Sequence, residues 1–429
     1  MAAEHRLTEL DTGVRVVTEA MPSVRSVALG FWVGTGSRVE DDAQAGLSHL
    51  LEHLLFRGSS RYGSLEIDQI FDTMGAEINA GTGKETTSLY SRVLDVHLER
   101  AMDVMADMIW SPALEEVDAE RAVVLEEIAM YEDDPQDKIF DLLGEAVFGD
   151  DPLGRAIIGR PEVIRDTPVD AIRAFHRARY RPDTVVVAGA GSIEHDRLVE
   201  LVAASQPGDE RLGDTAPYGA PYSRPHVRFE RKDTEQYHVC LGAPGIARDD
   251  ERRFALRVLD NILGGTSSSR LFQEVRERRG LAYSVYTFLN HYAGTGQIGL
   301  YLGTRSDNLA EALQVVGAEL ERIRDEPATR DELERSKENV KGRVVLSLES
   351  TSTRMNRLGS SVLTDVPVLG LDEVIERIDA VRLDDLRELA NELWPLERLS
   401  AAGIGVDPNV FGEAVAPLGL HGPPEAAAA

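Results

Sequence analysis

The sequence predicts an α+β protein made of two homologous domains, and three observations lead to this prediction. Apolar residues recur along the chain with the period of two that is typical of strands or the longer period that is typical of helices. The stretch Ser205 to Pro225 is rich in Pro, Gly, Asp and Ser and has neither period, which is typical of a linker. A residue pattern that precedes this stretch returns after it, which indicates an internal duplication.

The duplication is clearest at the ends of the two halves. Each half ends in a Glu-Val-Ile segment, a second helical segment, one aromatic residue and an apolar strand that closes with Gly-x-Gly. In the first half these segments are 162–164, 170–173, Tyr180 and 187–191, and in the second half they are 373–375, 384–387, Trp394 and 401–405. We therefore expect a first domain at 1–212, a linker at 213–225, a second domain at 226–420 and a flexible tail at 421–429.

Within the first half, apolar patterns predict strands followed by helices. Two strands are expected at 14–18 and 26–33 and are interpreted as a pair, and a further strand is expected at 86–93. Helices are expected at 45–56, 66–74, 95–109 and 115–132, and glycine or proline signals follow the first and the last of them. The first half is therefore expected to contain both strands and helices.

Composition and charge exclude several classes of protein. The chain is 42% hydrophobic and 28% charged, as globular proteins are, and no apolar stretch approaches the roughly 18 residues of a membrane span. Its formal net charge of -28 disfavours nucleic acids and anionic membranes as partners, because both are bound through clustered Lys and Arg. We expect neither kind of partner.

The single cysteine and the first residues of the chain bear on its location. Cys240 lies in an apolar alternation, where we expect it to be buried, and one cysteine cannot form an intramolecular disulfide. The first residues lack the basic run and the apolar block that mark a secretory signal. The expected location is the cytoplasm.

Histidine and glutamate side chains cluster in the helix predicted at 45–56. His49 and His53 are four residues apart with Glu52 between them, so all three share one helix face. Two imidazoles at this spacing can bind one zinc ion, and a carboxylate beside them can move a proton from the attacking water to the leaving amine. Burial of such groups without a partner is costly, which favours a metal site over a chance cluster. We predict one zinc ion per chain with Glu52 as the base, although cobalt or manganese can use the same ligands.

The third metal ligand has to come from another part of the chain, since catalytic zinc usually keeps three protein ligands and one open position. The helix predicted at 115–132 carries Glu120 and Glu127 seven residues apart, on one face. Glu126 points about 100° away from that face. The spacing alone does not decide between Glu120 and Glu127, and both are also compatible with solvated surface acids.

Together these motifs resemble a known family. The motif His-x-x-Glu-His, followed about 75 residues later by Glu-x6-Glu, resembles the pitrilysin family (M16) of zinc metallopeptidases. The sequence is most similar to the subfamily of bacterial processing-type proteases and mitochondrial processing peptidase (M16B), and the resemblance covers essentially the whole chain. It implies that Glu127 is the third zinc ligand and that Glu120 is a supporting acid that orients a ligand or tunes the site.

The resemblance also implies substrate-binding residues in both halves. Active members carry an Arg and a Tyr seven residues apart in the second half, matched here by Arg276 and Tyr283, which would bind a substrate carbonyl or carboxylate and the oxyanion. Asn79 and Ala80 match the strand to which a peptide adds. From the residues alone, Arg276 reads as a surface residue, Tyr283 as a strand residue and Asn79 as a turn residue before Gly81.

The fold and function that the resemblance implies are specific. The fold is two α/β-roll domains, each a mixed, mainly antiparallel sheet with helices on one side, which form half of a clam-shell. The expected activity is that of a zinc metalloendopeptidase that hydrolyses extended peptides or unfolded segments in a chamber enclosed by a homodimer, or by a heterodimer with a related chain. The alternatives are an inactive homologue with a structural or assembly role and a peptide-binding module that keeps zinc but turns over negligibly.

Overall fold

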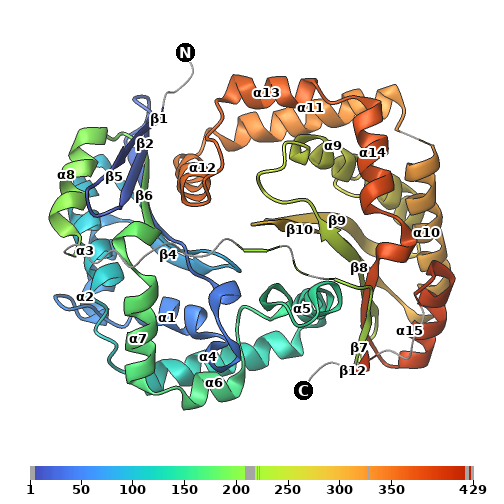
Figure 1. The fold of residues 1–429 in the computed structure, drawn as a ribbon, viewed down its shortest axis with the longest axis horizontal. Helices are drawn as coiled ribbons and strands as arrows, with labels where there is room; N and C mark the ends of the chain where they lie inside the picture. Colours follow the sequence, from blue (N-terminus) through green and yellow to red (C-terminus); the bar gives the residue numbers. More distant parts are fainter. Residues whose placement is uncertain are drawn as a thin grey trace. The chain divides into compact units, whose positions relative to one another are not determined.

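A computed structural model describes residues 5–207, 218–219, 221, 223–326, 328–420 and 425–426 of the chain (Figure 1). Within these residues the strands form two six-stranded sheets, and the chain divides into two compact units. Unit 1 comprises the described residues of Met1–Ala129, Ala156–Ala216 and Val345–Asp372. Unit 2 comprises those of Met130–Arg155, Pro217–Val344 and Glu373–Ala429. The prediction of an α+β protein is confirmed.

The sheet of unit 1 has the strand order β1-β2-β6-β3-β5-β4. Its strands are β1 (His5–Glu9), β2 (Arg15–Ala20), β3 (Ser26–Val33), β4 (Glu77–Thr82), β5 (Thr87–Leu94) and β6 (Val185–Gly191). Only β2 and β6 are parallel neighbours; the other pairs are antiparallel. The prediction that 14–18 pairs with 26–33 is wrong, because β6 lies between them. All residues of β6 are small or apolar and buried, which suits the middle of a sheet covered on both faces.

The helices of unit 1 follow the predicted pattern closely. They are α1 (Leu47–Leu55), α2 (Ser64–Met74), α3 (Leu98–Trp110), most of α4 (Val117–Asp133), α6 (Pro161–Asp166), α7 (Val169–Arg179), α8 (His195–Ser205) and α12 (Thr351–Leu363). The first four lie within three residues of the predicted ranges. Apart from α12, the helices of unit 1 pack their apolar residues against one face of the sheet and form one core with it. In this core, Leu29 and Phe31 of β3 pack with Leu50 and Leu54 of α1.

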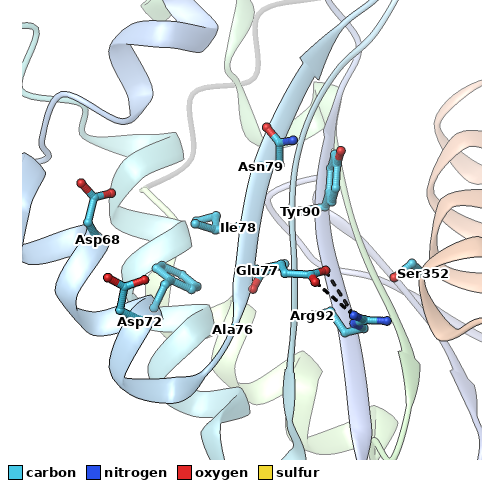
Figure 2. A pocket seen from close by; sticks show the side chains of 11 residues that line it. Asp68, Asp72, Ala76, Glu77, Ile78, Asn79, Tyr90, Arg92 and Ser352 are labelled. Atoms are coloured by element: carbon cyan, nitrogen blue, oxygen red, sulfur yellow. Dashed lines mark hydrogen bonds and ion pairs between the residues drawn. The ribbon is translucent and has the colours of Figure 1, made fainter.

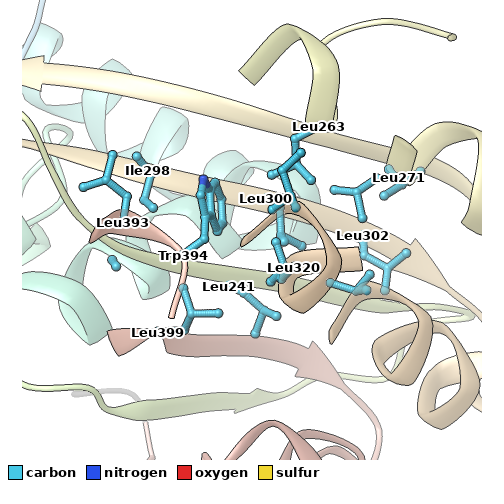
Figure 3. Close-up of a cluster of buried hydrophobic side chains, with 14 of the residues drawn as sticks. Leu241, Leu263, Leu271, Ile298, Leu300, Leu302, Leu320, Leu393, Trp394 and Leu399 are labelled. Atoms are coloured by element: carbon cyan, nitrogen blue, oxygen red, sulfur yellow. The ribbon is translucent and has the colours of Figure 1, made fainter. Parts of the chain in front are cut away.

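Unit 2 has the strand order β12-β7-β11-β8-β10-β9 and repeats the topology of unit 1 except at one edge, where β12 is parallel to β7 while β1 is antiparallel to β2. Its strands are β7 (Val227–Arg231), β8 (Tyr237–Gly245), β9 (Ala282–Tyr292), β10 (Thr295–Thr304), β11 (Ser400–Gly405) and β12 (Glu425–Ala426). Its helices are α5 (Pro135–Phe148), α9 (Arg253–Leu263), the π-helical turn η6 (Phe272–Glu277), α10 (Leu309–Asp325), most of α11 (Arg330–Ser347), most of α13 (Leu371–Asp379), α14 (Leu383–Leu393) and α15 (Pro408–Val415). Figure 3 shows its core, where Trp394 lies among leucines from strands and helices.

The second face of each sheet is covered by a single helix that comes from the other half of the sequence. In unit 1, Ala28 and Ala188 of the sheet pack with Met355 and Leu358 of α12. The buried carboxylate of Glu19 binds two arginines of the same helix. In unit 2, α5 lies on β8 and β11 and covers the buried Cys240, as expected for that residue. The sequence had predicted helices on one side only, and these two helices are additional to those.

This exchange of helices changes the domain boundaries. The sequence predicts contiguous domains at 1–212 and 226–420, whereas segment 130–155 belongs to unit 2 and segment 345–372 belongs to unit 1. The reason is burial, because each sheet has a second apolar face that only a helix from the other half covers. Most of the predicted linker at 213–225 lies outside the described residues. The predicted tail at 421–429 also lies outside them, except for residues 425–426.

The predicted duplication matches the topology of the two sheets. Segments 187–191 and 401–405 fall in β6 and β11, which occupy the same place in their sheets and have the same parallel and antiparallel neighbours. None of the helices in the described part of the chain is both long and apolar enough to cross a membrane.

Candidate active site

Helix α1 carries the histidine motif, and a buried carboxylate fixes its first turn. Glu40 is 2% exposed, and its two oxygens accept hydrogen bonds from the backbone N–H groups of Gly46 (2.8 Å) and Ser48 (2.7 Å). A negative charge at this end of a helix is favourable, because the first N–H groups have no partner within the helix. Gly46 has a φ of 100°, a conformation that glycine adopts readily. The leucines of α1 face the core, so the polar motif faces away from it.

Three side chains converge at α1 and α4. The Nε2 atoms of His49 and His53 are 3.3 Å apart, and the Glu127 Oε2 atom lies 3.3 Å from His53 Nε2 and 3.7 Å from His49 Nε2. Among the described residues, this is the group of His, Cys, Asp and Glu side chains that could hold a metal ion. Zinc bonds of 2.0–2.1 Å in a tetrahedron place ligand atoms about 3.3 Å apart. These three residues therefore fit a zinc ion and leave one position open.

The protonation of His49 and the orientation of His53 also suit metal binding. Burial lowers the pKa of His49 to about 4, with a further contribution from His53, so its imidazole is neutral near pH 7. A neutral imidazole is the form that binds a metal ion. The Nδ1 atom of His53 lies 2.8 Å from Glu120 Oε1. This contact fixes the ring and the tautomer in which Nε2 is free to bind.

Glu120 and Glu127 have different surroundings, although the sequence could not separate them. Glu120 is 2% exposed, and its second oxygen pairs with Arg57. Both of its oxygens are thus engaged away from the three converging atoms, whereas Glu127 points at the two Nε2 atoms. The sequence reasoning missed Arg57. No local pattern signals this contact, because α1 ends at Leu55 and Arg57 lies beyond it.

Glu52 lies beside the histidines and is held by a strand. The Thr82 hydroxyl donates to Glu52 Oε2 over 2.5 Å. Burial raises the pKa of Glu52 above its ordinary value, and the hydrogen bond from Thr82 opposes that shift. The sequence reasoning missed Thr82, because it did not extend the strand of Asn79 and Ala80 to that residue, whereas β4 continues to Thr82.

The predicted peptide-binding residues Asn79 and Ala80 lie in β4, at the edge of the sheet. The alternative interpretation of Asn79 as a turn residue is wrong. Its Oδ1 atom accepts a hydrogen bond from the Ala80 N–H at 2.8 Å. A cavity of about 700 Å³ lies beside this edge. Figure 2 shows Asp68 and Asp72 of α2 and the ion pair between Glu77 and Arg92, which border it. The edge of β4 is thus accessible along the residues that the resemblance selected.

Arg276 and Tyr283 lie close to each other in unit 2. Arg276 belongs to η6 and donates a hydrogen bond to the Tyr283 carbonyl oxygen at 3.1 Å. Its guanidinium carbon lies 4.3 Å from the centre of the Tyr283 ring, within the range of a cation–π contact. Tyr283 is 75% exposed, so its ring and hydroxyl are available to a ligand. The histidines, Glu52, Glu120 and Glu127 all belong to unit 1.

Family models match both halves of the chain. The model described as insulinase (peptidase family M16) matches residues 15–160, and the model described as the peptidase M16 inactive domain matches residues 167–340. The chain belongs to peptidase family M16. The metal-binding residues predicted from the sequence all lie within the first of these two matches.

Several relatives of this M16 chain are named uncharacterized zinc proteases. One from Streptomyces coelicolor is 42% identical and aligns over 90% of this chain and 87% of its own length. One from Bacillus subtilis is 41% identical over 89% of this chain and 94% of its own length. The crystal structure of a protease from Helicobacter pylori has a TM-score of 0.87 at 23% identity and covers 94% of this chain and all of its own. A peptidase M16 inactive domain from Pseudomonas fluorescens has a TM-score of 0.86 at 21% identity, over 94% of this chain and 98% of its own. These two structures support the fold.

Proposed function

We propose that this M16 chain is a zinc-dependent metalloendopeptidase that hydrolyses extended peptides or unfolded segments. The observation that carries the proposal is the convergence of His49, His53 and Glu127 on one point, with Glu52 on the same helix beside them. The names of the relatives, zinc proteases, support the same conclusion. A structural homologue without activity would have no need of this set of residues.

Each residue of unit 1 has a role in this proposal. His49, His53 and Glu127 hold the metal, and Glu120 orients His53 through its Nδ1 atom. A bound zinc ion lowers the pKa of water to about 7 and polarises a carbonyl group. Glu52 accepts the proton of the attacking water and delivers it to the leaving amine.

The substrate class follows from the edge strand. An extended peptide that adds to β4 is recognised through its main chain, so the sequence of the peptide matters less than its ability to become a strand. Asn79 and Ala80 lie on this strand, and we assign them to substrate binding. A folded protein has few segments that are free to pair in this way, so folded proteins are expected to be poor substrates.

The proposal includes a second set of substrate contacts and a second chain. Arg276 carries a fixed positive charge for a substrate carbonyl or C-terminal carboxylate, and the Tyr283 hydroxyl can donate to the oxyanion that forms during attack. We propose that two chains, identical or related, enclose the substrate. A chain that carries both sets of residues requires no separate catalytic subunit.

The test compares wild type with Glu52→Gln on a mixed pool of unstructured peptides, with zinc measured in both proteins. We expect wild type to hold about one zinc per chain and to cleave, a chelator to abolish cleavage, and Glu52→Gln to keep its zinc and lose activity by about 100-fold or more. Glu126→Gln is the matched control, since it changes a neighbouring glutamate outside the converging group. If both proteins hold zinc and neither cleaves any peptide, the enzyme proposal is wrong and a structural role replaces it.

A further inference from the structure

We propose that Thr82 is a positioning residue that holds the Glu52 carboxylate in the orientation needed for proton transfer. This inference rests on the proposed function, because it concerns the residue assigned there as the base. Thr82 is the last residue of β4, the same strand that carries Asn79 and Ala80. The strand assigned to peptide binding would therefore also set the position of the base.

The contact between Thr82 and Glu52 is short and directed. The Thr82 Oγ1 atom lies 2.5 Å from Glu52 Oε2 and 3.5 Å from the backbone oxygen of Ser48. A hydroxyl has one proton to donate, and the shorter contact with the carboxylate receives it. Hydrogen bonds from a hydroxyl to an ionised carboxylate are among the strong ones, typically 2.5–2.7 Å long. The Thr82 backbone also interacts with this carboxylate, so the end of β4 holds Glu52 through main chain and side chain together.

The surroundings of Glu52 make this donor important. Within the part of the chain that the structure describes, no other side chain has a hydrogen bond to the Glu52 carboxylate. Tyr180 is buried close enough to feel the charge of Glu52: burial raises the pKa of its hydroxyl, and the charge of Glu52 raises this pKa further. Without the Thr82 hydroxyl, Glu52 keeps only its contact with the Thr82 backbone, which holds the carboxylate less firmly in the productive orientation.

The position of Thr82 in the sheet connects the base to the peptide-binding strand. In the register of β4 with β5, Thr82 lies opposite Thr87 and Ala80 lies opposite Leu89. Side chains at alternate positions of a strand face the same side, so Ala80 and Thr82 both face the side of the sheet where α1 packs. The backbone of β4 thus sets the distance between a bound peptide and the carboxylate oxygen.

The experiment uses Thr82→Val, which keeps the shape of the side chain and removes the hydroxyl, and Thr82→Ser, which keeps the hydroxyl. We expect kcat of Thr82→Val to fall about 10- to 100-fold, as expected for a lost hydrogen bond to a charged group, with KM within about twofold of wild type. Thr82→Ser should restore most of kcat. Zinc content should equal that of wild type in both variants, and a crystal structure of Thr82→Val should show the Glu52 carboxylate rotated away from its wild-type position.

The matched control is Thr87→Val on the opposite strand. The Thr87 hydroxyl donates to the Thr35 backbone oxygen at 3.0 Å, so this variant removes a threonine hydroxyl from the same hairpin without touching Glu52. We expect it to lower thermal stability and to leave kcat unchanged. If Thr82→Val unfolds, Thr82→Ala compared with Thr82→Ser replaces it.

The outcomes separate this inference from the proposed function. In the Glu52→Gln background, Thr82→Val should have no further effect, because the base that Thr82 positions is already absent. If wild type cleaves and Thr82→Val keeps full kcat, or if Thr87→Val loses as much kcat as Thr82→Val, the inference is wrong and the proposed function stands. If zinc-loaded wild type cleaves nothing, both are wrong.

Discussion

The two units share the arrangement of five sheet strands and one Arg–Glu ion pair, yet they differ in what the glutamate of that pair binds. In both units the long helix that packs in the core has a glutamate in its first turn, paired with an arginine that follows a preceding helix. In unit 1 this pair is Glu120 with Arg57, and in unit 2 it is Glu332 with Arg270. Glu332 binds Arg270 through two hydrogen bonds and also accepts from Thr329. Glu120 instead divides its two oxygens between Arg57 and His53.

The helices next to this ion pair are also connected by different side chains in the two units. In unit 2 the helices α9 and α11 are connected by the amide pair Asn261 and Asn339, at 2.9 Å. In unit 1 the helices α1 and α4 are connected by His53 and Glu120, and the same histidine also joins the candidate metal group. The fold tolerates either arrangement, since function depends on the side chains that a fold carries and not on the fold itself.

The largest expected effect comes from removing a metal ligand in unit 1. His49→Ala should reduce bound zinc to near zero and peptide hydrolysis by about 10³-fold or more, because both the nucleophile and the polarised carbonyl depend on the metal. Zinc analysis and cleavage assays measure both quantities. The control is His238→Ala in unit 2, a buried histidine that contacts the Tyr301 hydroxyl. It should lose stability and keep its zinc. Loss of zinc in the control alone would contradict the assignment of the site to unit 1.

A second prediction concerns the contribution of unit 2 to the reaction. Tyr283→Phe should lower kcat by about 100-fold without loss of zinc, as expected for removal of one donor to the oxyanion. Tyr286→Phe is the control, because Tyr286 lies on the same strand and is 39% exposed. Steady-state kinetics with bound zinc quantified distinguishes the two. Equal activity of Tyr283→Phe and wild type would restrict the chemistry to unit 1.

A third prediction compares Glu120 of unit 1 with Glu332 of unit 2, each of which pairs with an arginine. Glu120→Gln should weaken zinc binding about 10- to 100-fold, because a neutral amide orients His53 less well than a carboxylate does. Glu332→Gln makes the same chemical change in unit 2 and should leave zinc affinity unchanged. Competition with a zinc chelator measures both affinities. Similar affinities of the two variants would mean that Glu120 has only a structural role.

The smallest expected effect is on stability and depends on pH. Burial opposes ionisation of Glu332, but hydrogen bonds from Arg270 and Thr329 outweigh it and lower the pKa from 4.5 to about 2. A lowered pKa means that the ionised group stabilises the fold fully above its ordinary pKa and that this stabilisation is lost as the pH falls towards 2. Glu332→Gln should therefore cost about 2 kcal/mol at pH 7, and the difference from wild type should shrink between pH 4.5 and pH 3. Denaturant unfolding at several pH values measures this difference. A difference that grows on acidification would show that Glu332 is not the stabilised anion inferred here.

Much of the candidate site was predictable because it lies within single helices. The i and i+4 spacing of His49 and His53 places both imidazoles on one face whatever surrounds the helix, and Glu52 lies between them for the same reason. Four helices of the first half were predicted to within three residues, since apolar periodicity records which face is buried. The repeat of the two halves was also visible in the sequence, as the equivalent places of β6 and β11 illustrate.

The sequence by itself thus determined four helices of the first half, the duplication and the donor types, because these follow from local periodicity and residue chemistry. Only the tertiary structure decided which glutamate turns towards the histidines, that β6 separates β2 from β3, and that α5 and α12 are exchanged between the units. It also decided that Arg57 binds the supporting carboxylate of Glu120 and that Thr82 binds the carboxylate of Glu52. These features depend on distances between segments remote in the sequence, and packing sets such distances by burying apolar faces that no local pattern can pair.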